Sequence, residues 1–250
     1  QRPIFHVNEE IVQDVLGDFL SNDFYGFDPE KVQFIVQPVF NGYALGSDGS
    51  FQLAERSARL PYGHGYATMQ LNYKDAFTLD RSGRVRRSAA PVIQALSQND
   101  PNDEAFLGTH RVNDTTKFVT DEVVDLDRLA LSAYLIEQKN HGIVIDLVGN
   151  PLKSKGGNNA RYAGDANSFL IETSNAKGSP HLTGLLDGAA GAPYNAFRLV
   201  STPKRYEALL RQGFPYNLRF KNGFFYLESV TGDLTQLPAS NSVAIQEGDA

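Results

Sequence analysis

The chain has 250 residues, a formal net charge of −6 and no cysteine. This length allows a sizeable core, and we expect one α/β domain over residues 1–237 followed by a polar tail over 238–250. The acidic balance excludes general binding to the nucleic-acid backbone, and no apolar run is long enough for a membrane span. The lack of cysteine favours a cytoplasmic location, while the start at Gln1 leaves a processed, fragmentary or secreted chain open.

The first forty residues alternate between strand and helix patterns. Residues 3–7 predict a short strand, and Asn8 is a capping residue before apolar side chains that recur at helical spacing up to Leu20. Residues 23–28 predict a loop. Residues 32–40 are almost continuously apolar and rich in β-branched side chains, as in a buried, parallel strand. This order predicts an α/β fold with a mixed, largely parallel sheet and flanking helices.

A turn with two glycines follows, Pro61-Tyr62-Gly63-His64-Gly65, which we call the glycine turn. Because glycine lets a backbone approach a ligand closely, Gly63 and Gly65 are candidates for pressing main-chain amides against a base or sugar. The alternative is a tight solvent-exposed loop. Further on, four arginines surround Gly83, and this basic turn is either an anion grip or a solvated hairpin tip.

The second half predicts another strand–helix–strand unit. Residues 106–112 precede a helix that opens at Asp125 or Asp127, and residues 143–148 are the clearest strand in the chain. In open α/β sheets the ligand lies beyond the carboxyl ends of strands, which places Asp114 where chemistry is expected. After these come a helix starting at Pro203 and a hairpin over residues 214–229, with Asn222-Gly223 as its turn.

Several common catalytic designs are absent from the sequence. There is no Gly-x-Ser-x-Gly elbow, no helical histidine pair of a zinc protease and no Walker loop. What remains is Asp114 at a predicted strand end, the glycine turn, and the loop lysines Lys153, Lys155 and Lys221. A carboxylate that holds a divalent ion and lysines that neutralise phosphate oxygens are the parts that nucleotidyl transfer requires. Taken singly, each of these residues also fits an ordinary turn or surface position.

The order of these features over residues 3–237 resembles the catalytic domain of the UDP-sugar pyrophosphorylase family, which includes the UTP–glucose-1-phosphate uridylyltransferases. The matching segments are Phe34–Gln37, Ser47-Asp48-Gly49, the glycine turn, Asp114, Lys155-Gly156-Gly157, Leu170-Ile171-Glu172, Tyr194-Asn195-Ala196-Phe197 and Lys221. The resemblance implies a Rossmann-like nucleotidyltransferase fold. It also implies a reaction of UTP with a sugar 1-phosphate that gives a UDP-sugar and pyrophosphate, with Mg²⁺.

The same resemblance implies roles for single residues. Gln37 and the backbone of Gly63, His64 and Gly65 would read the uracil, and Asp114 would hold the metal. Asn195 would contact the sugar, while Lys155 and Lys221 would meet phosphate groups.

The chain also departs from the family pattern. No glycine-rich loop precedes Pro3, and Tyr66 and Ala67 follow the glycine turn where the family has an acidic residue. A homologue without catalysis is therefore one alternative. A non-catalytic secreted or structural domain that binds carbohydrate or protein is another, and the aromatic residues in several loops suit such contacts.

Overall fold

A computed structural model describes residues 2–100, 102, 104–110, 126–149, 158–161, 169–172, 194–214 and 216–246. The chain forms two compact units. Unit 1 comprises Gln1–Leu96 and Leu210–Thr231, and unit 2 comprises Ser97–Leu209 and Gly232–Ala250. Each unit is built from two separate stretches of sequence. Within the described ranges, no helix is long and apolar enough to cross a membrane.

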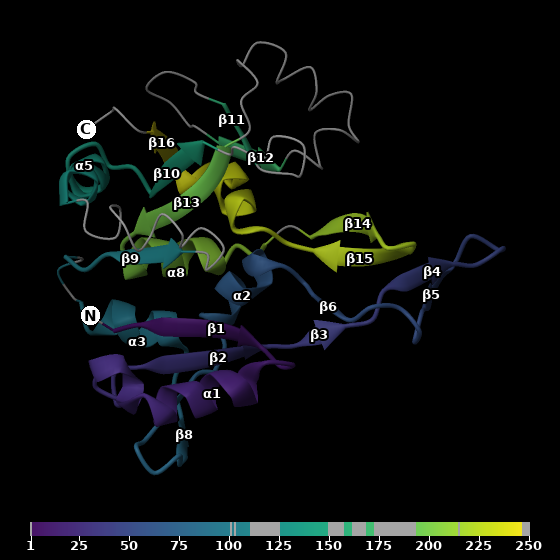
Figure 1. The fold of residues 1–250 in the computed structure, drawn as a ribbon. Coiled ribbons are helices and arrows are strands. Elements are labelled where there is room, and N and C mark those ends of the chain that lie inside the picture. The colour runs from purple at the N-terminus through teal and green to yellow at the C-terminus, as the bar shows by residue number, and fades with distance from the viewer. Residues whose placement is uncertain are drawn as a thin grey trace. The chain divides into compact units, whose positions relative to one another are not determined.

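Unit 1 begins with a β–α–β arrangement (Figure 1). Strands β1 (Ile4–Asn8) and β2 (Gln33–Gln37) pair in parallel, and helix α1 (Val12–Ser21) connects them. The sheet continues antiparallel through β7 (Phe77–Leu79) to β8 (Val85–Arg87). The predicted first strand, helix and buried strand are therefore present in the expected order.

Aromatic side chains form the core of this first sheet. The ring of Phe34 lies against three neighbours, with centroid distances of 5.1 Å to Phe19, 5.8 Å to Phe77 and 5.9 Å to Phe5. Phe34 is fully buried, and the surrounding cluster also contains Phe24. Ile35, the next residue on β2, is fully buried as well, and Gln37 is the last residue of the strand.

A second sheet of unit 1 joins segments from both of its stretches. Its four strands lie in the order β14-β15-β4-β5, and every pairing in it is antiparallel. Their bounds are Asn217–Lys221, Phe224–Glu228, Tyr43–Leu45 and Phe51–Leu53, in that order. The other elements of unit 1 are η1 (Asp23–Gly26), β3 (Val39–Phe40) paired with β6 (Leu60–Pro61), α2 (His64–Gln70) and α3 (Val92–Gln98).

Unit 2 is built on a mixed sheet in which β13 (Tyr194–Ser201) pairs antiparallel with β10 (Ile143–Gly149) and with β9 (Leu107–His110). Because both neighbours run opposite to β13, β9 and β10 run parallel to each other on either side of it. Strand β10 also pairs in parallel with β16 (Ser242–Gln246). The remaining elements are α5 (Leu126–Glu137), β11 (Asn158–Arg161), β12 (Phe169–Glu172), α8 (Pro203–Leu210), η4 (Thr231–Gln236) and η5 (Pro238–Ser240).

The interior of unit 2 combines an apolar cluster with a buried ionic group. Asp146 on β10 is fully buried and accepts hydrogen bonds from Arg128 Nη1 at 2.9 Å and Arg198 Nη2 at 3.0 Å. Charge-assisted bonds to both carboxylate oxygens offset the cost of burying the carboxylate. The apolar cluster consists of Ile136, Val144, Val200 and Ile245.

The prediction of a mixed α/β fold is confirmed, whereas its description as Rossmann-like and largely parallel is not. Among the described strands, parallel pairing joins β1 to β2 and β10 to β16, and the other pairings are antiparallel. Part of the segment predicted as a polar tail forms β16, because its residues continue the edge of the unit 2 sheet.

Candidate functional site

The glycine turn leads from β6 into helix α2, and both of its glycines are close to residue 229. Gly63 has a φ of +87°, and a Cβ on it would overlap the carbonyl oxygen of Ser229. A Cβ on Gly65 would overlap Ser229 Oγ. Because the segment that follows β15 passes so close, neither position has room for a side chain, and only glycine fits at both.

Backbone hydrogen bonds hold the two segments together. The N–H of Ser229 donates to the carbonyl of Tyr62 at 2.7 Å, and the N–H of Gly65 donates to the carbonyl of Ser229 at 2.9 Å. The amide of Gly65 is therefore engaged within the protein. The expectation that backbone amides of Gly63 and Gly65 read a base stays a prediction.

His64 is fixed by the same segment. Its Nδ1 atom accepts a hydrogen bond from the backbone N–H of Thr231 at 2.9 Å and lies 2.7 Å from the hydroxyl oxygen of Thr231. The hydroxyl of Thr68 donates to the carbonyl oxygen of His64 at 2.9 Å. Because the amide of Thr231 can only donate, Nδ1 must be the unprotonated nitrogen of the neutral ring, and Nε2 carries the proton.

Gln37 is joined to the glycine turn through its side chain. The Nε2 group donates to the carbonyl oxygen of Gly63 at 2.7 Å, and the residue is only 9% exposed. Within the described part of the chain, no hydrogen bond reaches the other amide atom, Oε1. The structure thus places four predicted site residues, Gln37, Gly63, His64 and Gly65, in one cluster of unit 1 with a carbonyl acceptor available on Gln37.

An aromatic cluster lies beside the turn. The rings of Phe40 and Tyr62 stack with centroids 3.7 Å apart and an interplanar angle of 4°, and Tyr62 also contacts Tyr66 and Tyr216 edge-on. Burial, followed by the nearby Tyr43 hydroxyl, raises the pKa of Tyr62 to about 12. The Tyr62 hydroxyl is therefore neutral at physiological pH, and the cluster offers aromatic faces without charge.

Lys221 lies at the turn end of β14 and is bound to Glu228. Its Nζ atom is 2.9 Å from both carboxylate oxygens, and the side chain is 44% exposed. The same carboxylate faces Arg219, whose Nε is 3.4 Å from Oε2 and whose side chain is buried. A Cβ on Gly63 would touch Glu228 Cγ at 2.8 Å, so Glu228 lies directly beside the glycine turn.

The other predicted site residues are not placed by the structure. Asp114 and Lys155 lie outside the described residues, and of Asn195 only the backbone, within β13, is described. Among the residues that the structure describes, no group of three or more histidine and carboxylate side chains is arranged to hold a metal ion. The roles predicted for Asp114, Lys155 and Asn195 stay predictions.

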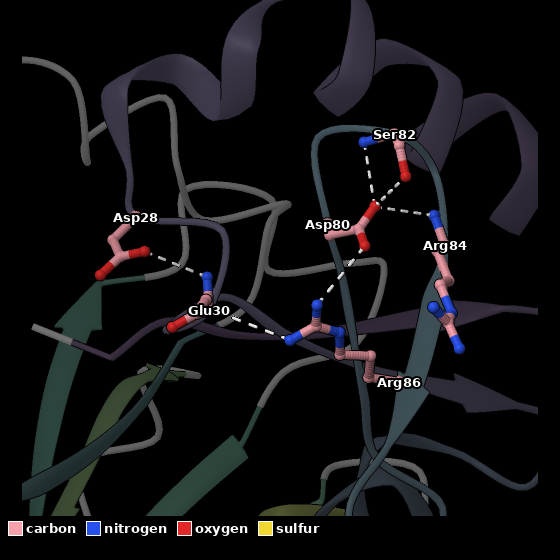
Figure 2. Close-up of polar contacts among 6 residues, drawn as sticks. All are labelled: Asp28, Glu30, Asp80, Ser82, Arg84 and Arg86. Carbon is pink, nitrogen blue, oxygen red and sulfur yellow. Dashed lines mark hydrogen bonds and ion pairs between the residues drawn. The ribbon is translucent and has the colours of Figure 1, made fainter.

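The basic turn between β7 and β8 is organised by its own acidic residue (Figure 2). Asp80 accepts hydrogen bonds from the Ser82 hydroxyl at 2.6 Å and from the backbone N–H of Arg84 at 3.0 Å, and these hold the pKa of Asp80 below its usual range. Arg86 forms exposed ion pairs with Asp80 and Glu30. These contacts favour the solvated hairpin tip over the anion grip.

Three residues of the cluster were not among the predicted site residues: Glu228, Ser229 and Thr231. The hairpin that contains β14 and β15 was predicted, but no local signal shows that its end packs on residues 63–65. The pair of glycines was itself a weak signal, because glycine allows the close approach of another backbone as well as that of a ligand.

The fold is similar to that of known UDP-sugar pyrophosphorylases. The UDP-glucose pyrophosphorylase from Leishmania major aligns with a TM-score of 0.61 and 14% identity over 98% of this chain. The uridine diphosphate N-acetylglucosamine pyrophosphorylase from Trypanosoma brucei, solved with an inhibitor, aligns with a TM-score of 0.60 and 12% identity over 98% of this chain. A point mutant of the Leishmania major enzyme, solved with UDP-glucose, aligns with a TM-score of 0.59 and 13% identity over 98% of this chain.

This chain spans about half the length of these solved structures: 51%, 47% and 51% of theirs, respectively. No protein-family model and no curated protein matches the sequence significantly. At these identities the similarity is one of fold alone.

Proposed function

We propose that the chain binds a uridine nucleotide or a UDP-sugar at the cluster formed by Gln37 and the glycine turn. The observation that carries this proposal is the hydrogen bond from Gln37 Nε2 to the Gly63 carbonyl. It orients the amide so that Oε1 is left as an acceptor. Uracil carries a hydrogen on N3 that such an acceptor pairs with, and the adjacent Phe40 and Tyr62 rings offer faces for stacking.

The finer proposal is a nucleotidyltransferase of Rossmann-like type. An oxygen of a sugar 1-phosphate attacks the α-phosphorus of UTP, the bond to the β-phosphate breaks, and the products are a UDP-sugar and pyrophosphate. Asn195 would contact the sugar, and Lys155 would neutralise phosphate oxygens. Lys221 would exchange its bond to Glu228 for one to a phosphate, so that it keeps an anionic partner.

The proposal includes Mg²⁺, which Asp114 would bind. A carboxylate with phosphate oxygens is a common ligand set for this ion. Among the described residues, no group of three or more histidine and carboxylate side chains adds to Asp114 as ligands.

Calorimetric titration with UTP, CTP and UDP-glucose tests the proposal. CTP is the informative competitor because its N3 has no hydrogen to donate to Gln37 Oε1. We expect UTP to bind at least about tenfold more tightly than CTP, and Gln37→Ala to remove most of that preference. Gln13→Ala is the matched control, since Gln13 is exposed on α1.

Two further arms separate binding from turnover. Titration with and without Mg²⁺, repeated on Asp114→Ala, tests the metal. Release of pyrophosphate from UTP and glucose 1-phosphate tests the reaction. Equal binding of UTP and CTP, or no binding of either by folded protein, would refute the nucleotide site. Uridine-specific binding without turnover would support the site and reject catalysis.

A further inference from the structure

The four-stranded sheet of unit 1 presents an apolar face to solvent. Its register pairs Phe220 with Phe225, Phe225 with Tyr43, and Tyr43 with Leu53. Directly paired residues point to the same side of a sheet, and every second residue along a strand does so too. We call the resulting set the apolar face: Tyr43, Leu45, Phe51, Leu53, Leu218, Phe220, Phe225 and Leu227.

This face is unusually exposed for its composition. Phe220 is 64% exposed, Leu53 60% and Leu45 56%, and Phe51 and Leu218 are each at least half exposed. The rings of Phe51 and Phe225 are 5.3 Å apart, which joins β5 to β15 across the sheet. Contiguous apolar patches larger than a few hundred Å² are rare on monomeric proteins and mark interaction sites.

The opposite face of the same sheet carries its charged side chains and is packed in part. It carries Arg219, Lys221 and Glu228, together with Tyr226, whose hydroxyl donates to the carbonyl of Ala58 at 2.8 Å. An antiparallel sheet with one solvated face normally exposes its polar side and buries its apolar side. Here part of the polar side also reaches solvent, through Gln52 and Lys221, and the exposed apolar face would be stabilised by a cover from outside.

We propose that this cover is a second copy of the chain, and that the protein is a dimer with the two apolar faces packed against each other. None of the eight side chains carries a charge, so the face is complementary to itself, as a two-fold interface requires. Sheets pack face to face in this way in β-sandwiches, at about 10 Å separation.

The available area fits a dimer. If a fully exposed side chain of this size presents roughly 200 Å², the exposures amount to roughly 600–700 Å² per protomer. A standard specific interface buries about 800 Å² per partner. Tyr43 adds an aromatic ring with a polar hydroxyl to the face, and tyrosines are enriched in protein interfaces.

The first test measures the mass of the full chain in solution by sedimentation equilibrium over a range of concentrations. We expect a dimer for the unaltered protein. Phe220→Lys and Leu53→Lys place charges in the face and are expected to weaken dimerisation by about a hundredfold or more. Val85→Lys is the matched control, because Val85 is an apolar strand residue on β8, 49% exposed, outside the face.

The second test uses the absence of cysteine from the sequence. Leu227→Cys introduces a single thiol on the face, and Val85→Cys introduces one elsewhere. A short thiol-reactive crosslinker should join two copies of the first variant and not of the second. Circular dichroism confirms that each variant is folded, and because the thiol change is mild it keeps the test informative where a lysine variant unfolds.

A monomer at every concentration of the unaltered chain would overturn the proposal and leave another apolar partner as the occupant. A dimer that neither lysine variant weakens would also overturn it. If the Val85→Cys variant crosslinked as readily as the Leu227→Cys variant, the association would be nonspecific. The apolar face would then not be the dimer interface. This inference is independent of the nucleotide site.

Discussion

The backbone N–H of Thr231 donates a hydrogen bond to Nδ1 of His64, with the two nitrogens 2.9 Å apart. These residues are 167 positions apart in the sequence, and Thr231 is buried. The bond ties the start of helix α2 to the residue that ends unit 1. It also gives the imidazole a structural task that the sequence alone did not reveal.

We predict that His64→Ala lowers the free energy of unfolding by about 1–2 kcal/mol, because it leaves the buried Thr231 amide without its acceptor. Urea denaturation checks this value. The ¹⁵N chemical shifts of the His64 ring in neutral buffer should show the proton on Nε2. A proton on Nδ1 would contradict the hydrogen bond, whatever the stability of the variant.

Gly65→Ala should destabilise the protein by about 3 kcal/mol, because its Cβ would lie 2.7 Å from the backbone of Ser229 and Val230, which cannot move aside cheaply. Gly17→Ala is the control. Gly17 is also helical, on α1, and has no atom within 4 Å of its added Cβ, so alanine should stabilise by about 0.5–1 kcal/mol. Thermal unfolding of both variants gives the comparison, and similar midpoints for the two would refute the close contact at residue 65.

Glu228→Gln should cost about 3 kcal/mol of stability, since it leaves buried Arg219 beside Lys221 with no carboxylate between them. Lys221→Met should cost less than about 1 kcal/mol, because Lys221 is half exposed and its removal leaves Glu228 paired with Arg219. Denaturant titrations of the two variants measure the difference. Equal stability of Glu228→Gln and Lys221→Met would show that the Glu228 carboxylate does not stabilise Arg219 and Lys221 as described.

Local signals predicted much of the fold. Helix α1 lies in the region where a helix was expected, although it begins at Val12 with Ile11 as its N-cap. The side-chain oxygen of Asn8, the predicted cap, instead accepts the N–H groups of Glu10 and Ile11 in the turn that precedes the helix. Asn222 and Gly223 both have positive φ, as the predicted two-residue hairpin turn requires. Such features depend on residues a few positions apart, so a single sequence carries them.

Features set by distant contacts could not be predicted. Residues 23–28 were expected to form a loop, yet Asp23, Phe24 and Tyr25 all adopt left-handed backbone conformations that non-glycine residues rarely take. The buried ring of Phe24 belongs to the same core cluster as Phe34 and Phe77, and these tertiary contacts hold a turn that local preferences oppose. The largely parallel sheet failed for a similar reason, because strand pairing is decided by partners far away in the sequence.

The candidate site shows the same division. The family resemblance implied that Gln37 and the glycine turn act together, and the structure joins them through a hydrogen bond. It did not predict that Ser229 occupies the space that the two glycines leave open, because a contact across more than half of the chain leaves no pattern in either segment.

The stability of the protein should fall in mild acid because of His6. Its Nε2 atom is buried, with no hydrogen-bond partner among the described residues, and burial lowers the pKa of His6 from 6.5 to about 4. Between these values the unfolded chain binds a proton that the folded chain does not. The contribution of neutral His6 to the free energy of unfolding is therefore fully present above pH 6.5. It is lost as the pH falls toward 4, and the loss reaches about 3 kcal/mol.

Urea unfolding at a series of pH values across that window measures the effect, and His6→Phe is the comparison. The phenylalanine variant should lose the part of the pH dependence that belongs to His6. An identical pH dependence in both proteins would assign the acid sensitivity to other groups.

The interleaving of the two units has a consequence for how the protein is made. Unit 1 ends at Thr231, and unit 2 starts at Ser97 and is completed by residues from Gly232 onward. A ribosome therefore releases the glycine turn long before Ser229 and Thr231, its partners, have been synthesised. The nascent chain must hold the part of unit 1 up to Leu96 in an unfinished state while most of unit 2 emerges. Unit 1 is completed at Thr231 and the sheet of unit 2 only at β16, so the folding of the two units is coupled in time even though their cores are separate.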